Sequence, residues 1–288
     1  MNKQLWYTIV FALCLLIPVQ VYAQLERERA NPERDVELTF MAPRNINLYT
    51  VETLGKTELH YSIMHTFGEV RSGIQNLYGI DREANVRFSF EYGLTDHLSI
   101  GFGRSSLDKI YDFTSRINLF RQNTTNSVPV SMSLIPTLGI NTTEFGFLDT
   151  PYSFIERFSY GLSLPIARKF NDQLSLQLSP MLVHFNRVGN ELSIANPQNN
   201  NYYSLTLAGR YKVTPYTALS FQFIPPINDK RNPNIAVGID IETGGHVFQM
   251  FFSTSRALND QYLLAGDNGN FFKREFRFGF NINRLFKL

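Results

Sequence analysis

The chain has 288 residues, of which 27 are Lys or Arg and 25 are Asp or Glu, so its formal charge at pH 7 is +2. This near balance argues against a nucleic-acid-binding protein, because phosphate recognition needs a strong basic excess. Hydrophobic residues make up 43% of the chain, which excludes general disorder, and 25 Phe with 14 Tyr favour strands over helices.

The first 23 residues have the pattern of a secretory signal peptide. A positive start is followed by a nearly unbroken apolar run over 7–17, and we expect cleavage between Ala23 and Gln24. The run is shorter than the roughly 20 apolar residues that a spanning helix needs, which disfavours a membrane anchor. The one cysteine, Cys14, lies in this run, so no disulfide or thiol chemistry is expected after export.

Residues 24–56 are predicted to form a periplasmic N-terminal extension. The stretch from Leu25 to Glu37 is dense in charge and has no sustained periodicity, which is typical of a mobile segment. The stretch from Arg44 to Gly55 is more apolar, and we expect it to fold against the barrel mouth or to enter the lumen. The extension is also where a periplasmic partner is expected to bind.

From about Thr57 onward the sequence alternates with period two. In the last segment, for example, Phe276, Phe278 and Phe280 alternate with Arg277 and Gly279. Such alternation predicts strands with one apolar and one polar face. No later stretch approaches 18 consecutive apolar residues, so a second helical span is not expected.

Twelve such segments can be counted, and each is near the 9–11 residues that a tilted strand needs to cross a bilayer. The connections after the second, sixth, eighth and tenth segments are short, whereas those after the first, fifth, seventh and eleventh are long and polar. This alternation predicts an all-β fold, a closed antiparallel up-and-down transmembrane β-barrel of about 12 strands over 57–288, with both termini at the periplasmic side. The segments are 57–67, 84–94, 97–105, 110–121, 127–139, 156–167, 173–185, 202–213, 217–225, 234–243, 246–255 and 274–286.

A soluble sandwich also alternates, so the composition of each face decides between the two folds. The apolar face is aromatic and aliphatic with almost no charge, as a lipid-facing wall requires, since a charge at mid-bilayer costs about 2–4 kcal/mol. Closure removes the sheet edges that hydrocarbon would not tolerate. The predicted location is therefore the outer membrane, and the predicted partners are outer-membrane lipid and the barrel-assembly machinery.

The polar face carries five acids, five bases and one histidine that are candidates for lining the lumen. An open pore would use these charges to select ions, whereas a closed barrel would pair them. Their even balance favours neither anions nor cations, and twelve strands leave a narrow lumen. We favour a paired network that constricts a narrow channel. The candidates are Glu58, His60, Arg87, Glu91, Asp112, Arg116, Arg210, Lys212, Asp240, Glu242 and Arg277.

A search for chemistry finds no catalytic, cofactor-binding or metal-binding motif. The segment Gly101-Phe102-Gly103 begins like a dinucleotide loop but lacks the third glycine and the following helix. A membrane-embedded lipid hydrolase could use His65 or His184 with a serine, but no motif brings those residues together. We therefore expect no cofactor and no enzymatic activity.

Several longer motifs lie along residues 44–286. They include Arg44-Asn45-Ile46-Asn47-Leu48, His65-Thr66-Phe67-Gly68, Tyr92-Gly93-Leu94-Thr95-Asp96, Gly238-Ile239-Asp240-Ile241-Glu242 and Phe278-Gly279-Phe280-Asn281-Ile282. These motifs resemble an uncharacterised family of Bacteroidota-type outer-membrane β-barrels that carries a domain-of-unknown-function label. Members of that family often have Arg where Thr66 stands here. The resemblance implies the barrel fold and the outer-membrane location, and it implies no established activity.

Three functions therefore follow from the sequence. The favoured one is a narrow pore or transport protein that moves small solutes across the outer membrane. The second is a structural or partner-binding barrel without transport. The third, disfavoured by the absence of a motif, is the lipid hydrolase.

Overall fold

The computed structural model describes residues 33–146, 148 and 151–288. The predicted signal peptide, its cleavage site and the start of the extension lie outside the described residues. Among the described residues, no helix is long and apolar enough to cross a membrane.

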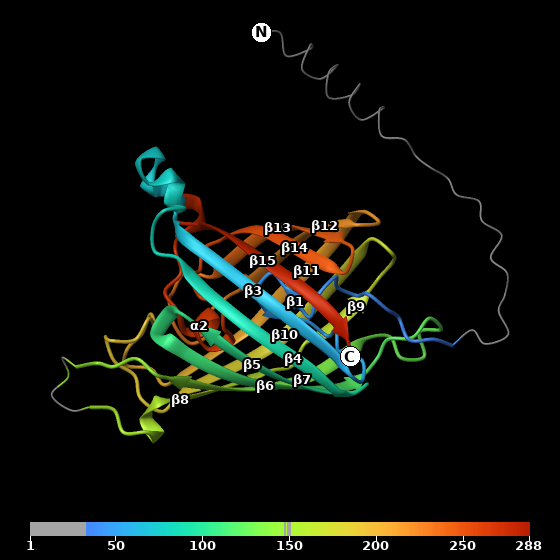
Figure 1. Cartoon of the computed structure of the whole chain (residues 1–288), viewed down its shortest axis with the longest axis horizontal. Helices are drawn as coiled ribbons and strands as arrows, with labels where there is room; N and C mark the ends of the chain where they lie inside the picture. Colours follow the sequence, from blue (N-terminus) through green and yellow to red (C-terminus); the bar gives the residue numbers. More distant parts are fainter. Residues whose placement is uncertain (1–32, 147, 149–150) are drawn as a thin grey trace, which may run out of the picture. The chain divides into compact units, whose positions relative to one another are not determined.

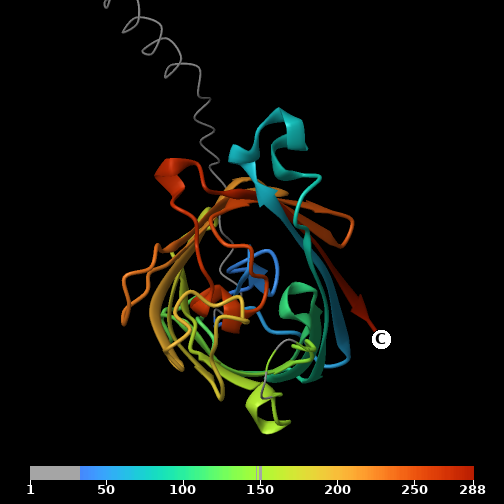
Figure 2. The same cartoon turned by 90° about the vertical axis from the view of Figure 1, so that its left-hand side faces the viewer.

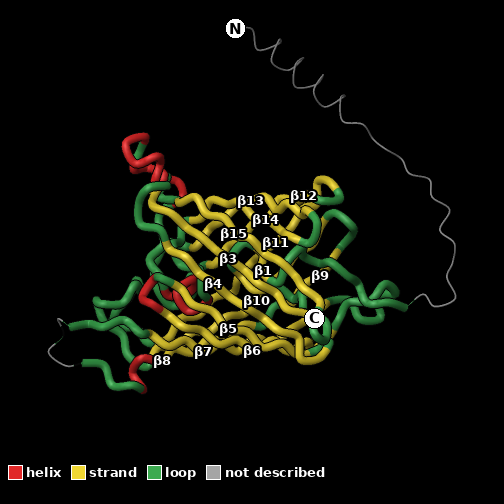
Figure 3. Tube along the Cα trace, viewed as in Figure 1, coloured by secondary structure: helices red, strands yellow, loops and turns green. Residues whose placement is uncertain are grey.

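In the described part of the chain, thirteen strands form one antiparallel sheet that closes on itself (Figures 1 and 3). β15 pairs with β3 over ten residue pairs and completes the ring. β8 and β9 each pair with both β7 and β10, so together they fill one position, and the barrel has twelve positions. The predicted twelve-strand barrel fold is confirmed. The strands are β3 (Glu58–Glu69), β4 (Asn85–Thr95), β5 (Leu98–Ser105), β6 (Ile110–Phe120), β7 (Ser131–Asn141), β8 (Phe158–Ser163), β9 (Ile166–Lys169), β10 (Leu174–Phe185), β11 (Asn201–Thr214), β12 (Thr217–Ile224), β13 (Asn234–Thr243), β14 (His246–Ser253) and β15 (Arg277–Lys287).

The sixth barrel position differs from the single strand that the sequence predicts. The chain leaves the ladder at Leu164 and Pro165, between β8 and β9. Proline has no N–H to donate to a neighbouring strand, which explains why the ladder breaks there. Two hydrogen bonds bridge the break, from the N–H of Ser133 to Pro165 O at 3.1 Å and from the N–H of Leu164 to Pro180 O at 3.0 Å.

The alternation of the sequence becomes an alternation of burial across the barrel wall. Along β7 every second residue is buried, from Ser131 to Asn141, and the residues between them face outward. Large apolar side chains on the outward face are strongly exposed, including Phe90 at 47% and Phe113 at 45%. Continuous exposure of this kind is rare in a water-soluble monomer and common on a surface covered by lipid.

The two ends of the barrel differ in the length of their connections. Tight turns such as Pro215-Tyr216 and Gly244-Gly245 lie at one end, which we call the short-turn end. Gly244 and Gly245 have φ of 54° and 86°, values that suit glycine in a two-residue hairpin turn. The connection 121–130 also lies at this end and is longer than the others. The opposite, long-loop end carries the connections 70–84, 106–109, 142–157, 186–200, 225–233 and 254–276.

Two segments fill the inside of the ring (Figure 2). One is a hairpin of β1 (Arg44–Asn45) and β2 (Leu48–Tyr49), which belongs to the predicted extension. The other is α2 (Asp260–Ala265), a short helix in the connection 254–276, and all six of its residues are buried. We call residues 38–54, which include this hairpin, and α2 together the plug. The sequence predicts a long polar loop where α2 lies, and it leaves open whether the extension enters the lumen.

Candidate functional site

The eleven predicted lumen residues all occupy positions that alternate onto the inward face of their strands. Seven of them are buried and form the middle of the lumen wall: His60, Arg87, Glu91, Asp112, Arg116, Arg210 and Asp240. The other four are partly exposed: Glu58, Lys212, Glu242 and Arg277.

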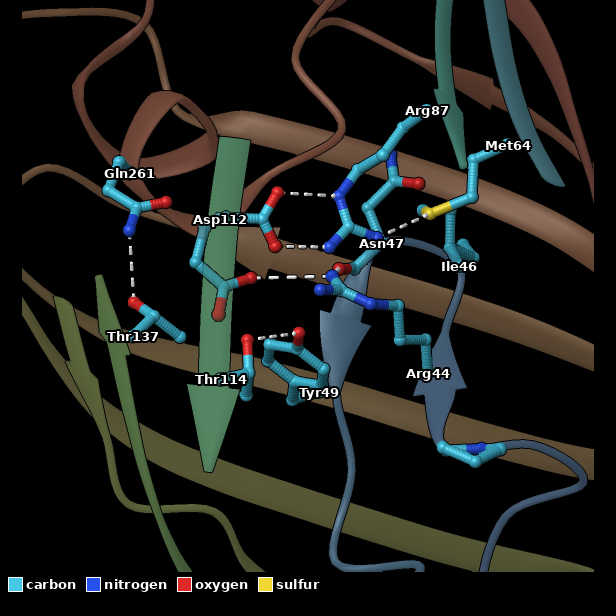
Figure 4. A network of polar contacts seen from close by, with 12 residues as sticks. Arg44, Ile46, Asn47, Tyr49, Met64, Arg87, Asp112, Thr114, Thr137 and Gln261 are labelled. Carbon is cyan, nitrogen blue, oxygen red and sulfur yellow. Dashed lines mark hydrogen bonds and ion pairs between the residues drawn. The ribbon is translucent and has the colours of Figure 1, made fainter. Parts of the chain in front are cut away.

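The first buried ion pair joins β4 to β6 across β5. Arg87 Nε donates to Asp112 Oδ2 at 3.1 Å, and Arg87 Nη2 contacts the other carboxylate oxygen, which makes the pair bidentate (Figure 4). Gly103 on β5 lies beneath the pair, and a Cβ there would stand 2.3 Å from Arg87 Nη2. The absence of a side chain at Gly103 therefore makes room for the guanidinium.

The second buried ion pair joins β6 to β4, and its arginine also contacts the segment after the hairpin. Arg116 Nε and Nη2 donate to the two oxygens of Glu91 at 2.8 and 3.0 Å. Arg116 Nη1 also donates to the carbonyls of Thr50 and Glu52 at 2.7 and 2.6 Å. Buried charges need such additional partners, because Coulomb attraction alone rarely repays their desolvation.

A third ion pair joins the two halves of the plug. Arg44 Nη1 of the hairpin lies 3.3 Å from Asp260 Oδ1 of α2, and each side chain is only 4% exposed. The Arg44 guanidinium also stacks 3.6 Å from the Tyr49 ring, whose hydroxyl is 2.9 Å from Thr114 Oγ1 on β6 (Figure 4). Neither Arg44 nor Asp260 is among the charged lumen residues that the sequence predicts. The apolar run from Tyr262 to Ala265, unusual in a polar loop, could have indicated a buried segment near Asp260.

Amide side chains of the wall satisfy the backbone of the hairpin. They come from β10, β12, β14 and β15, and they take the place of the neighbouring strands that a two-stranded sheet lacks. The docking is therefore polar and involves several strands. The bonds are Gln177 Nε2 to Tyr49 O at 2.8 Å, Gln222 Oε1 from Asn47 N at 3.1 Å, Gln249 Nε2 to Arg44 O at 3.1 Å and Asn281 Nδ2 to Ile46 O at 2.7 Å.

α2 and the residues before it are held in a similar way. Gln261 Nε2 donates to Thr137 Oγ1 on β7 at 3.1 Å. The Arg256 carbonyl accepts hydrogen bonds from Thr66 Oγ1 at 2.7 Å and from Asn85 Nδ2 at 2.9 Å. Apolar packing adds to these contacts, because Tyr262 meets the Phe185 ring edge-on at 5.5 Å.

Two small cavities lie between the plug and the wall beside His60. A cavity of about 130 Å³ near the short-turn end has plug residues such as Phe40 and Leu54 on one side and His60 and Arg284 on the other. A second cavity of about 10 Å³ shares Pro43 and His60 with the first and reaches Arg44 and Arg87. His60 therefore lies where these spaces meet.

Several buried polar atoms of the plug and wall have no hydrogen-bond partner among the described residues. Buried polar groups are costly unless they are hydrogen-bonded, so such atoms are suited to contact with water or a polar solute. The lumen therefore has polar atoms that form no hydrogen bond with the described residues. The atoms include Asn47 Nδ2 and Oδ1, Gln177 Oε1, Arg210 Nε and Asn281 Oδ1.

The histidines considered for hydrolysis lie on the outer wall in aromatic stacks. The His65 ring is 4.8 Å from that of Phe280, and the His184 ring is 6.2 Å from that of Tyr160. His184 Nδ1 is 2.9 Å from Asn201 Oδ1. These contacts position the rings and do not form a nucleophile–base pair. Within the described ranges, no group of three His, Cys, Asp or Glu could hold a metal ion.

Comparison with solved structures finds barrels of similar extent at low sequence identity. The NanC porin is 9% identical, with 80% of this chain and 100% of that chain covered and a TM-score of 0.49. The COG4313 outer membrane channel from Pseudomonas putida F1 is 16% identical, with 82% and 97% covered and a TM-score of 0.47. A comparison with curated proteins found no match.

A family model described as a membrane bound beta barrel domain (DUF5777) matches residues 40–286. The match includes the β1–β2 hairpin and every strand of the barrel except the final residue of β15. The hairpin is thus within the region that defines the family. This chain belongs to the family of membrane-bound β-barrel domains.

Proposed function

We propose that this protein is a narrow outer-membrane channel for small polar solutes, and that the structure shows its plugged form. The observation that carries the proposal is the chemistry of the plug–wall boundary. Residues 44–52 meet the wall through several side-chain hydrogen bonds, and Ile46 also packs against Ala236 and Phe251. A typical hydrogen bond contributes only about 0.5–1.5 kcal/mol net, since water replaces it when it breaks. A polar boundary therefore favours a plug that can shift.

The outer-membrane location is supported by three features of the chain. Its N-terminal residues have a signal-peptide pattern, its strands alternate between short turns and long loops, and its outer wall is apolar. The motif resemblance to Bacteroidota-type barrels agrees with the same location. We infer that the short-turn end faces the periplasm.

The solute class follows from the balance of charge in the lumen. The three buried ion pairs, Arg44–Asp260, Arg87–Asp112 and Arg116–Glu91, contribute equal numbers of positive and negative groups. Such a lumen discriminates little between anions and cations. We therefore expect selection mainly by size, with passage along β3 past His60.

A second candidate function, a structural barrel without transport, is favoured by the same buried contacts. The plug is held from both ends, and Arg44–Asp260 joins its halves at the centre. If these contacts never open, the barrel presents loops and the N-terminal extension and passes no solute.

Conductance in planar bilayers distinguishes the two functions. We expect the purified chain to give small intermittent currents, and Arg44→Gln with Asp260→Asn to make openings longer or more frequent. Asp172→Asn is the matched control, because it removes an ion pair whose carboxylate is fully exposed. If neither the double variant nor a chain lacking residues 38–54 passes current after correct insertion, the transport proposal is wrong and the structural function is favoured.

A further inference from the structure

Two loop tips project beyond the circumference of the barrel at the long-loop end (Figure 2). The first tip is built from residues 70–84 together with 271–274, and Arg71 Nη1 links its parts to Glu275 Oε1 at 2.7 Å. The second tip is built around residues 154–157 and lies on the opposite side of the ring (Figures 1 and 2). We call them the first and second rim tips.

Several apolar side chains of the rim tips are unusually exposed. On the first rim tip, Phe272 is 91% exposed and Ile74 is 67% exposed. On the second, Phe154 is 71% and Ile155 is 62% exposed. Single exposed apolar residues are ordinary, but grouped ones at a projecting tip mark an interaction surface.

The backbone of the first rim tip turns outward at a conformational cost. Leu77 and Tyr78 have φ of 44° and 54°, in the left-handed region that bulky residues rarely adopt. Both side chains are more than half exposed. The turn thus presents two further apolar side chains outward and leaves them uncovered by the chain itself.

An unbroken ladder of aromatic rings connects the barrel wall to the first rim tip. It climbs the outer face of β15 and β14 and ends at the most exposed side chain of the tip. No polar ring interrupts it between the wall and the tip. The successive centroid distances are 5.9 Å for Phe278–Phe252, 5.6 Å for Phe252–Phe276, 5.5 Å for Phe276–Phe271 and 5.9 Å for Phe271–Phe272.

A second, shorter ladder leads to the second rim tip. The His184 ring on β10 stacks 6.2 Å from Tyr160 on β8, which lies 6.5 Å from Phe158. Phe158 then meets Phe154 edge-on at 5.1 Å. The same construction therefore occurs twice, on strands that lie far apart around the ring.

We propose that both rim tips dock into the lipid bilayer, with their apolar side chains at the boundary between lipid headgroups and acyl chains. Each ladder is continuous with the outer wall of a membrane-bound barrel, so lipid that covers the wall reaches the tips without crossing a polar band. Aromatic side chains are enriched at this boundary, where one edge is wet and the other apolar.

Charged side chains on the rim tips are placed for the same boundary. Lys273 and Arg274 are exposed beside Phe272, and Arg187 lies 3.5 Å from Glu156 beside Phe154. Long basic side chains extend their heads to lipid phosphates while their stems cover apolar surface. A second copy of the chain is a poorer occupant, because two small tips on opposite sides offer no contiguous face of the roughly 800 Å² per partner that a stable interface buries.

Single tryptophans test the proposal, and they do so whether or not the lumen conducts. Trp6, the one tryptophan of the chain, lies in the predicted signal peptide, so the processed chain is the background for Phe272→Trp and Phe154→Trp. Gln198→Trp is the matched control, because Gln198 is exposed in the connection 186–200. This connection is held to α2 by a hydrogen bond from Ala195 N to Ala265 O at 2.9 Å. Each protein is inserted into phosphatidylcholine–phosphatidylglycerol vesicles that contain brominated lipid.

We expect blue-shifted emission and several-fold stronger quenching by bromines near the glycerol for the tip variants than for the control. Aqueous iodide should show the reverse order. If tip and control tryptophans respond alike to both quenchers, the tips face water and the proposal is wrong. The proposal is also wrong if brominated lipid quenches the tip tryptophans only at low protein-to-lipid ratios, because a second copy of the chain then covers the tips at higher ratios.

Discussion

At the scale of single residues, Arg116 has the most demanding position in the lumen. It is fully buried, pairs with Glu91 and supplies hydrogen bonds to the hairpin backbone. Arg116→Met should lower the free energy of unfolding by about 3–5 kcal/mol, because it leaves a buried carboxylate unpaired. Chemical unfolding in detergent micelles measures this loss.

The double variant Arg116→Met with Glu91→Gln is the control for this prediction. It removes the unpaired charge along with its partner, so it should be less destabilised than Arg116→Met alone. Equal stability of the single and double variants would show that the pair is not coupled and that Arg116 acts through the hairpin carbonyls only.

A second residue-scale prediction concerns pH at the first rim tip. The backbone N–H of Asn270, followed by the charges of Arg71 and Lys273, lowers the pKa of the Glu275 carboxyl below its ordinary value of 4.5. Because the pKa of Glu275 is lowered in the folded loop, its carboxylate stabilises this loop at pH values above the ordinary pKa. This stabilisation is lost as the pH falls through the lowered pKa. The emission of Phe272→Trp should therefore change below about pH 4.5, and Glu275→Gln should abolish the change.

At the scale of elements, the strands are the part of the fold that the sequence predicts well. Their period-two pattern depends only on which face meets lipid, so no knowledge of distant partners is needed. The strand predicted from residue 84 begins at Asn85, and the last predicted strand, 274–286, is observed over Arg277–Lys287. The alternation alone does not predict the break at Pro165, which follows from the missing N–H of proline.

The plug is the part that the sequence does not predict. The hairpin has two residues per strand and owes its position to Gln177, Gln249 and Asn281, which lie far away in sequence. The sequence does not distinguish an inward-facing amide that contacts water from one that binds a docked backbone. Alternation predicts which face of a strand a charge occupies, but the pairing of Arg44 with Asp260 depends on two connections whose paths no local pattern fixes.

α2 provides the element-scale prediction. Leu263 is fully buried in the apolar cluster around Tyr262. Leu263→Ala should cost about 2–5 kcal/mol locally, since it leaves a cavity in this cluster. Release of the connection 254–276 should then appear as faster proteolysis of the intact barrel from outside. Ile227→Ala, an exposed site in the connection 225–233, is the control and should leave the rate unchanged. Equal rates for all three chains would show that α2 docks without Leu263.

At the scale of the whole molecule, the barrel and its plug are held by different kinds of contact. The wall is closed by strand pairing, including the ten pairs between β3 and β15. The plug is attached to that wall by side-chain hydrogen bonds and by apolar packing. Closure of the ring satisfies the backbone hydrogen bonds of every strand, and the hairpin takes no part in this pairing. The wall should therefore fold without the hairpin in the lumen.

Deletion of residues 38–54 tests this separation. The shortened chain should still insert as a compact barrel that unfolds only on heating, as seen by its gel mobility before and after boiling. Its conductance should be steady and larger than that of the intact chain, because the hairpin no longer fills the lumen and α2 loses its Arg44 contact. Compact insertion without increased current would mean that residues 38–54 do not restrict the lumen, and if the double variant also passes no current the transport proposal is wrong. Loss of the compact form would instead show that the hairpin is needed for the wall to close.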